Sequence, residues 1–379
     1  MKYILLPFIF FTAFGCSHSL GRFPKNESGW IPKQHFIARL FTPSDLTGRL
    51  NKPEERSSPL IIGDTIYQGS VRNHFFALSR KSGKMIWKKF IEGGVESNPQ
   101  YFDGKIYVGA NDGHFYCLDA KSGKTIWRYN TETEILSRPL IKGGIVYFLT
   151  VKNGLYALKS DTGKWLWYYN KGYSQKISVR GTSSPVFEDG KIYAGFSDGG
   201  IAVLNAFDGA VIWSKKLTQG DKFVDIDVTP IVSERRIFVA TSDGFVYALN
   251  SIDGGIRWKR KFSGANALAN DNSRIYFSTH EDVIALDQDD GEEVWRFRFK
   301  EGATTDFLLI EDQLIFGTPS SYVYSLATDN GEPIWRYTTD SGLFAQPAFA
   351  PESNGRLYLF TRLASLHAID PFYLLPETE

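Results

Sequence analysis

The sequence predicts an all-β protein, an eight-bladed β-propeller of four-stranded antiparallel blades that is closed by an N-terminal strand. Three observations predict it: a tryptophan that recurs about every 40 residues, a glycine four residues before each tryptophan, and strand-length runs between turn signals. The tryptophans are Trp87, Trp127, Trp167, Trp213, Trp258, Trp295 and Trp335, and the glycines are Gly83, Gly123, Gly163, Gly209, Gly254, Gly291 and Gly331. Helical solenoids share such periods, but they need long runs with apolar spacing of three and four, and none occurs between the turn signals.

One repeat, from Ser97 to Tyr129, illustrates the expected blade. The runs SNPQYF, KIYVGA, HFYCLDA and KTIWRY are rich in β-branched and aromatic residues and are separated by Asp-Gly, Asn-Asp-Gly and Lys-Ser-Gly. Glycine adopts a positive φ in the turn before the fourth strand at no steric cost. The tryptophan is expected to pack against the next blade, and the small residue before leucine, such as Ala77, leaves room for it. These tryptophans are therefore predicted to be architectural.

The number of blades follows from the starts of the first strands. The starts resemble Ser-x-Pro and recur at 57–59, 97–99, 137–139, 183–185, 228–230 and 345–347, with degenerate copies near Ala267 and Thr305. The eighth copy has three strands and ends at Pro371. The alternating stretch His35 to Leu40 is predicted to supply its outer strand, with Phe36 in the place of tryptophan, which removes an exposed sheet edge. A seven-bladed ring with a loose final segment is the alternative.

The N-terminal residues predict an export signal that ends at a site of lipid attachment. Met1-Lys2 precede a short apolar run to Phe14, and Ala13-Phe14-Gly15-Cys16 resembles a bacterial lipoprotein signal, in which Cys16 is acylated. Ser17, rather than aspartate, favours the outer membrane in such lipoproteins. An ordinary signal peptide is the alternative. The expected organisation is a signal peptide at 1–15, a lipidated tether at 16–34, the propeller at 35–371 and a tail at 372–379.

Composition argues against several function classes. The formal net charge is +1 and no basic block occurs, so nucleic acid is not an expected partner. Cys117 lies in the small-residue position before a leucine, which predicts a buried apolar side chain. The six histidines form no metal-spaced cluster, and His74 and His114 share one strand position in consecutive blades. No phosphate loop or nucleophile elbow is found, so we expect no catalysis, cofactor or metal.

The repeat, as in Ala77 to Trp87, resembles that of the propellers of pyrroloquinoline-quinone dehydrogenases. This resemblance implies the main rival function, which is oxidation of an alcohol or a sugar with quinone and calcium. The alcohol-oxidising members carry an adjacent cysteine pair beside the cofactor, and this sequence has no such pair. The shared repeat therefore supports the fold rather than the chemistry.

A narrower resemblance covers nearly the whole chain. The segments ILSRPLI (135–141), ISVRGTSSP (177–185) and FVDIDVTP (223–230) resemble signatures of the BamB family, non-catalytic eight-bladed lipoproteins of the outer-membrane β-barrel assembly (BAM) machinery. In that family the last two segments dock onto the periplasmic domains of BamA. Carried over by position, the resemblance implies that BamA is contacted by Ile177, Val179, Arg180, Asp225 and Asp227. It leaves open whether nascent outer-membrane proteins are also bound.

The spacing of the repeats points to the same region independently. The intervals between tryptophans are 40, 40, 46, 45, 37 and 40 residues, so the extra residues lie before the first strands of blades four and five. Equivalent connections in neighbouring blades lie side by side on one face of a propeller, and enlarged loops commonly bind partners. Arg180 pairing internally with Asp225 or Asp227 is the alternative. We expect a scaffold lipoprotein on the periplasmic face of the outer membrane, with another exported propeller that binds a protein or glycan as a further alternative.

Overall fold

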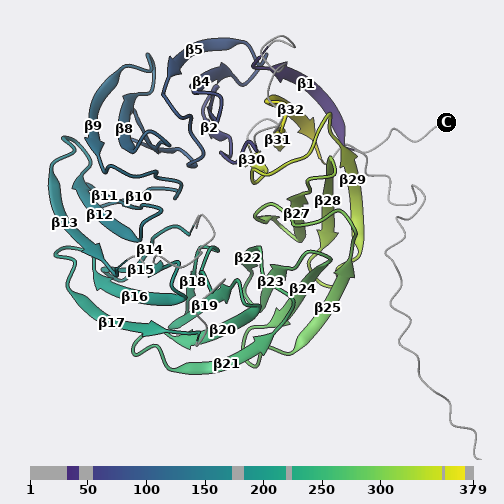
Figure 1. Ribbon diagram of the computed structural model, residues 1–379. Coiled ribbons are helices and arrows are strands. Elements are labelled where there is room, and N and C mark those ends of the chain that lie inside the picture. Colours follow the sequence, from purple (N-terminus) through teal and green to yellow (C-terminus); the bar gives the residue numbers. More distant parts are fainter. Residues whose placement is uncertain (1–31, 42–53, 173–182, 219–223, 352–354, 372–379) are drawn as a thin grey trace, which may run out of the picture.

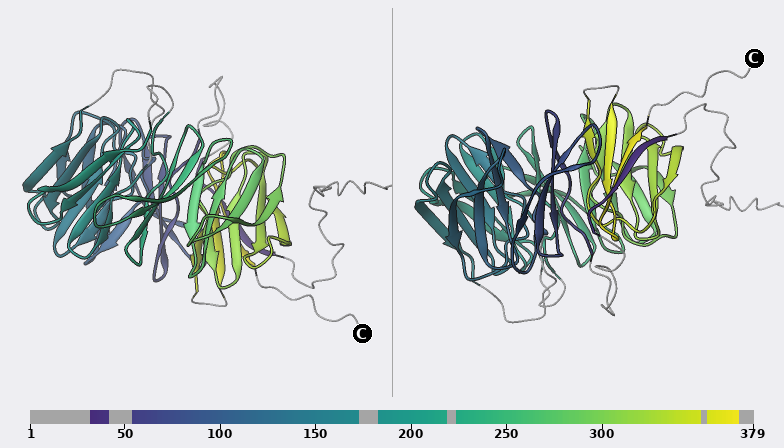
Figure 2. Two further views of the ribbon diagram at one scale, coloured as in Figure 1. Left: turned by 90° about the horizontal axis from the view of Figure 1, so that it is seen from below. Right: turned by 90° about the horizontal axis from the view of Figure 1, so that it is seen from above.

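The computed structural model describes residues 32–41, 54–172, 183–218, 224–351 and 355–371, and all regular elements among them are strands. Eight four-stranded antiparallel sheets follow one another around a common axis (Figure 1). Seen from the side, the ring is a thick disc in which the sheets stand next to one another (Figure 2). The predicted eight-bladed propeller is confirmed, and a seven-bladed ring is wrong.

The first four blades follow the repeat in order, each from its innermost to its outermost strand. Blade 1 is β2 (Leu60–Ile62), β3 (Thr65–Ser70), β4 (His74–Ser79) and β5 (Met85–Phe90). Blade 2 is β6 (Gln100–Phe102), β7 (Lys105–Gly109), β8 (His114–Asp119) and β9 (Thr125–Asn130). Blade 3 is β10 (Leu140–Lys142), β11 (Ile145–Leu149), β12 (Gly154–Lys159) and β13 (Trp165–Asn170). Blade 4 is β14 (Val186–Glu188), β15 (Lys191–Gly195), β16 (Gly200–Asn205) and β17 (Val211–Lys216).

The remaining blades complete the circle. Blade 5 is β18 (Ile231–Ser233), β19 (Arg236–Thr241), β20 (Phe245–Asn250) and β21 (Ile256–Lys261). Blade 6 is β22 (Ala267–Asn270), β23 (Arg274–Ser278), β24 (Asp282–Asp287) and β25 (Glu293–Arg298). Blade 7 is β26 (Leu308–Ile310), β27 (Gln313–Gly317), β28 (Tyr322–Ala327) and β29 (Pro333–Thr338). Blade 8 is β30 (Ala348–Ala350), β31 (Arg356–Phe360), β32 (Ser365–Asp370) and, outermost, β1 (Lys33–Arg39).

The hydrophobic core lies between blades rather than within one sheet. One cluster, for example, joins Phe75 and Ala77 of blade 1 to Ile106, Tyr116 and Leu118 of blade 2. Such two-sided packing requires both faces of every sheet to be apolar near the middle. This explains why the second and third strands of each blade are buried along most of their length.

The repeat tryptophans join neighbouring blades as predicted. The indole of Trp87 donates a hydrogen bond to the carbonyl oxygen of Ala120 in blade 2, at 3.1 Å, and that of Trp127 donates to Ser160 in blade 3, at 3.0 Å. Trp87 also pairs with the small residue Ala77 across the strands of its own blade. Trp335 differs, because its indole donates to the Gln313 side chain within blade 7, at 3.2 Å.

The N-terminal strand closes the ring as predicted. β1 pairs antiparallel with β32, begins slightly before the expected His35, and places Phe36 opposite Ala368. Trp87 occupies the same position opposite Ala77, so Phe36 replaces a tryptophan. A Cβ atom added to Gly83 would lie 2.8 Å from the Phe36 ring, just as one added to Gly123 would lie 2.6 Å from Trp87. The closing strand is therefore packed like an ordinary fourth strand.

A buried glutamate reinforces this closure. Val95 and Ile135 pack between blades at the position that Glu55 occupies before blade 1. The carboxylate of Glu55 instead accepts hydrogen bonds from Ser70 Oγ and from the Val71 N–H, both at 3.0 Å, and lies 3.2 Å from Arg72 Nε. Arg72 in turn donates to the carbonyl oxygen of Arg362 in blade 8. Burial raises the pKa of Glu55 to about 7, against the opposing effects of the hydrogen bonds and of Arg72.

Candidate protein-docking face and the central channel

The candidate docking face is the end of the ring where the fourth strand of one blade leads to the first strand of the next. The connections from β13 to β14 (171–185) and from β17 to β18 (217–230) are longer than the connection from β9 to β10 (131–139). Their blades are neighbours, so both connections lie at the same end of the ring. This agrees with the placement of the extra residues inferred from the tryptophan spacing.

Only part of the predicted contact set falls within the described residues. Ile177, Val179 and Arg180, together with Cys16, lie outside them. Asp225 and Asp227 are described and precede the first strand of blade 5. The structure therefore brings these two carboxylates together, and it leaves their pairing with Arg180 as a prediction.

The two aspartates differ in exposure. Asp225 is almost fully buried, with 1% of its surface exposed, whereas Asp227 is partly exposed. Ser242, in the turn after β19, donates its N–H to the carbonyl oxygen of Asp225 at 2.9 Å and its hydroxyl to Asp227 Oδ2 at 3.1 Å. A partner can therefore reach Asp227 more directly than Asp225, and Asp225 helps to hold the loop that presents it.

The environment of Asp227 favours its protonated form. Burial and the neighbouring charge of Asp225 raise the pKa of Asp227 to about 7, and the Ser242 hydroxyl and the charge of Arg56 oppose this rise. Arg56 precedes blade 1, and Asp227 has the corresponding position before blade 5. A cationic partner would lower this pKa, because its charge stabilises the ionised form.

Below this face, the residues just before the first strands line the central channel, with polar side chains at the middle position of the Ser-x-Pro starts. Neighbouring blades are joined here by hydrogen bonds. Ser58 N–H donates to Asn98 Oδ1 at 2.6 Å, Arg138 N–H to Ser184 Oγ at 2.9 Å, and Ser184 N–H to Thr229 Oγ1 at 3.2 Å. These bonds satisfy backbone groups that no strand partner can reach.

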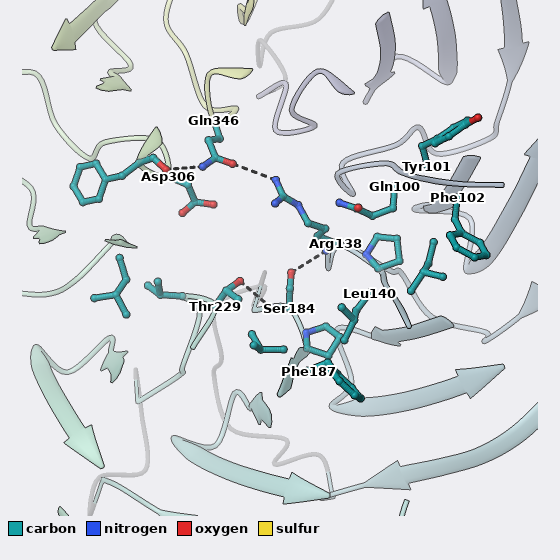
Figure 3. A pocket seen from close by; sticks show the side chains of 17 residues that line it. Gln100, Tyr101, Phe102, Arg138, Leu140, Ser184, Phe187, Thr229, Asp306 and Gln346 are labelled. Carbon is teal, nitrogen blue, oxygen red and sulfur yellow. Dashed lines mark hydrogen bonds between the residues drawn. The ribbon is translucent and has the colours of Figure 1, made fainter. Parts of the chain in front are cut away.

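A cavity of about 540 Å³ occupies the channel, and Arg138 extends across it (Figure 3). Its guanidinium donates to Gln346 Oε1 in blade 8 at 3.2 Å, and Gln346 Nε2 donates to the carbonyl oxygen of Phe307 in blade 7 at 2.6 Å. Asp306 lines the same cavity. Surrounding protein lowers the pKa of Arg138 and raises that of Asp306, while the attraction between the two opposes both shifts. Because both side chains are open to the channel, we expect both to be charged at neutral pH.

Sequence analysis did not identify Arg138, Asp306 or Gln346 as channel residues. Their position in the repeat could have identified them, because the middle residue of each Ser-x-Pro start faces the axis of the ring. Arg138 lies in the segment ILSRPLI, which served only as a family signature. Its reach to Gln346 joins residues 208 apart in the chain, and no local pattern indicates such a contact.

Other sequence predictions concern side chains away from this face. Cys117 is fully buried, and burial raises the pKa of its thiol to about 11, so it is an apolar core residue as predicted. His74 and His114 begin the third strands of blades 1 and 2, as predicted. Within the described ranges, no group of three His, Cys, Asp or Glu side chains is placed to hold a metal ion. No helix in the same part of the chain could span a membrane.

Comparison with known proteins identifies one family by sequence. The model of the family described as outer membrane protein assembly factor BamB matches residues 77–297 and 279–371. A curated outer membrane protein assembly factor BamB from Kangiella koreensis is 28% identical over 160 residues, which are 39% of this chain and 40% of that protein. The aligned part thus spans less than half of that relative.

Solved structures share the fold. BamB from Moraxella catarrhalis superposes with a TM-score of 0.74 at 22% identity, covering 89% of this chain and 99% of that chain. Quinohemoprotein alcohol dehydrogenase from Comamonas testosteroni superposes with a TM-score of 0.71 at 14% identity, covering 86% and 77%. At such identities the likeness establishes the propeller fold and not a shared activity.

Proposed function

Since the chain belongs to the family of the outer membrane protein assembly factor BamB, we propose that it is a non-catalytic scaffold lipoprotein of the BAM complex. In this proposal Cys16 carries the lipid that holds the propeller at the periplasmic face of the outer membrane. The propeller binds the periplasmic domains of BamA and assists the folding and insertion of outer-membrane proteins. The proposed organisation is a signal peptide at 1–15, a lipidated tether from Cys16 to the start of β1 at Lys33, the propeller to residue 371 and a tail at 372–379.

The observation that carries the proposal is the pair of long connections at one end of neighbouring blades, with Asp227 at their base. A rigid ring that presents two enlarged loops is suited to binding another protein, because the scaffold holds the loops in place without further ordering. Asp227, which is partly exposed and has a pKa near 7, is suited to a lysine or arginine of BamA. Ile177, Val179 and Arg180 complete the proposed contact in the connection before blade 4, and Asp225 supports it from beneath.

Co-purification from detergent-extracted outer membranes tests this contact. We expect Arg180→Ala, or Asp225→Ala combined with Asp227→Ala, to weaken recovery of BamA at least tenfold, which corresponds to about 1.4 kcal/mol. Asp161→Ala is the matched control, because Asp161 is an exposed aspartate in the turn between β12 and β13, at the other end of the ring. We expect this control to bind BamA normally.

The melting temperature separates this proposal from an internal ion pair. If the variants lose stability in proportion to the lost binding, Arg180 pairs with Asp225 or Asp227 to stabilise the ring. If they remain stable and still bind BamA normally, the proposed docking face is wrong. Capture of a different exported protein or a glycan in place of BamA would favour the alternative function, an exported propeller that binds that protein or glycan.

One observation favours the alternative function, a dehydrogenase that uses pyrroloquinoline quinone. Arg138 lines the channel cavity, and its positive charge could bind an anionic ligand there. Titration with pyrroloquinoline quinone in the presence of calcium tests it directly. Sub-micromolar affinity together with turnover of an alcohol or a sugar would replace the scaffold proposal.

A further inference from the structure

At the end of the ring opposite the docking face, the three most exposed apolar side chains are on blades 3, 4 and 5, while Met85, Ile86, Ile126 and Val294 are exposed at the corresponding strand starts of blades 1, 2 and 6. They lie in or next to the turns between the third and fourth strands. Phe207 and Ile252 have 82% and 59% of their surface exposed. At the turn position of Phe207 and Ile252, blades 1, 2, 3, 6 and 7 have a charged residue, which is Lys81, Lys121, Asp161, Asp289 or Asp329. We call the set the apolar rim, and it consists of Trp165, Phe207, Val211, Ile212, Ile252 and Ile256.

Packing between the blades fixes the turns that carry the apolar rim. The turn that carries Phe207 covers the preceding blade, since a Cβ added to Gly209 would lie 2.7 Å from Trp167. The turn that carries Ile252 covers blade 4 in the same way, because Gly254 packs against Trp213. A bulge lies between Trp165 and Trp167 in β13 and between Val211 and Trp213 in β17, so the two members of each pair lie on opposite faces of the sheet. The turns that carry Phe207 and Ile252 are each held by packing on the preceding blade, and their blades are neighbours in the ring.

Topology places the apolar rim and the start of β1 at the same end of the ring. In every blade the turn from the third to the fourth strand lies opposite the connection to the next blade. Lys33, the first residue of β1, pairs with Asp370 at the end of β32, which is the third strand of blade 8. The chain that leads from Cys16 therefore enters at the end of the ring that carries the rim. The 16 residues between Cys16 and Lys33 could span about 55 Å when extended.

Charge is distributed unevenly among these turns. On blades 1 to 3, next to the rim, residues 80–84, 120–124 and 160–164 contain six cationic side chains and one anionic one, Asp161. The exposed lysines among them are Lys81, Lys84, Lys121, Lys124 and Lys164, of which Lys81 lies 3.7 Å from Asp64. On blades 6 and 7, the corresponding residues 288–292 and 328–332 carry only acidic charges. Among these turns, those of blades 1 to 3 are therefore mainly basic and those of blades 6 and 7 are acidic.

We propose that the apolar rim and the adjoining lysines lie on the surface of the membrane that holds the lipid anchor, and that they bind anionic phospholipid. Exposed aromatic and aliphatic tips beside lysines suit an anionic bilayer, since the tips enter the interface and the lysines attract the headgroups. The tips project from turns at the outer edge of the ring. The docking face then points away from the membrane, where periplasmic domains are accessible.

This proposal rests on the proposed membrane anchor, but its test does not require lipidation or BamA. The full chain with Cys16→Ala is sedimented with vesicles of phosphatidylethanolamine and phosphatidylglycerol. We expect Phe207→Ser combined with Ile252→Ser to reduce the bound fraction at least tenfold. Phe90→Ser is the matched control, because Phe90 is 64% exposed but ends β5 at the docking end of the ring. We expect this control to bind vesicles as the parent does.

The lysines give a second readout. We expect Lys121→Glu combined with Lys124→Glu to weaken binding to the anionic vesicles severalfold, with no effect on the weaker binding to phosphatidylcholine vesicles. Raising NaCl to about 1 M, where charges are screened beyond about 3 Å, should reproduce this loss in the parent. The rim variants should keep their melting temperature and their recovery of BamA, which separates a failure here from a failure of the docking proposal.

Two results would overturn the inference. One is equal vesicle binding by the parent, the rim variant and the Phe90→Ser control. The other is self-association: the parent forms dimers in sedimentation equilibrium, the rim variant stays monomeric, and neither protein binds vesicles. The rim would then be an interface between two copies of the chain.

Discussion

At the scale of single residues, the repeat glycines satisfy two constraints together. Gly123 has a φ of +68° in the turn before the fourth strand, and its Cα lies against the indole of Trp87 in the preceding blade. The first constraint belongs to the turn, whereas the second belongs to the packing between blades. Because glycine alone lacks a Cβ, it meets both.

Substitution separates the two constraints. Gly104→Ala changes a glycine with a φ of +72° that has no atom within 4 Å of an added Cβ, so it should cost only the conformational strain, about 1 kcal/mol. Gly123→Ala adds a contact of 2.6 Å with Trp87 and should cost about 1–3 kcal/mol more. Denaturant unfolding of both variants measures the difference. Equal losses would show that the turn conformation alone selects this glycine.

At the scale of elements, closure of the ring depends on contacts that the other blade junctions do not use. β1 replaces a fourth strand with residues from the other end of the chain, and Phe36 replaces the tryptophan. Trp335, at the junction of blades 7 and 8, donates to Gln313 rather than to the next blade. Before blade 1, Glu55 and Arg72 form a polar contact. Before blades 2 and 3, the position of Glu55 is taken by Val95 and Ile135, which pack through apolar contacts. The buried carboxyl group of Glu55 makes the stability of this junction dependent on pH.

The raised pKa of the Glu55 carboxyl determines in which direction the stability changes with pH. Its folded pKa of about 7 lies above the usual 4.5, so its contribution to stability is complete at acid pH and is lost as pH rises through about 7. Glu55→Gln stays neutral. We expect the variant to gain about 1–3 kcal/mol relative to the parent between about pH 5 and pH 8.

Melting temperatures across this range measure the gain, with Glu92→Gln, an exposed glutamate, as the control whose difference from the parent should not change with pH. The opposite trend, with the parent gaining on Glu55→Gln as pH rises, would mean that pairing with Arg72 outweighs the cost of burial.

At the scale of the whole molecule, the two ends of the ring have different proposed roles. One end carries the long connections and Asp227 and is proposed to bind BamA. The other end receives the chain from the proposed lipid site and carries the apolar rim. A disc with these two ends can hold a partner at a set distance from a membrane, because its rigid thickness separates the two surfaces.

Removal of the anchor tests this arrangement. We expect Cys16→Ala to move the protein from the membrane fraction to the soluble periplasm or to leave it unprocessed, since acyl chains supply about 0.8 kcal/mol per buried methylene. Residual binding through the rim should then be released by high salt. Mass spectrometry of the parent provides the check, because an unmodified mature N-terminus away from Cys16 would refute lipidation.

The blade repeat, the number of blades and the closing strand could all be predicted from the sequence. These features depend on local physics: strand periodicity, turn chemistry and the missing fourth strand of the last repeat. The burial of Asp225, the reach of Arg138 to Gln346 and the apolar rim were decided only by the tertiary structure. Each of them depends on which residues the closed ring brings together, and strand periodicity carries no information about contacts across a channel or between the turns of neighbouring blades.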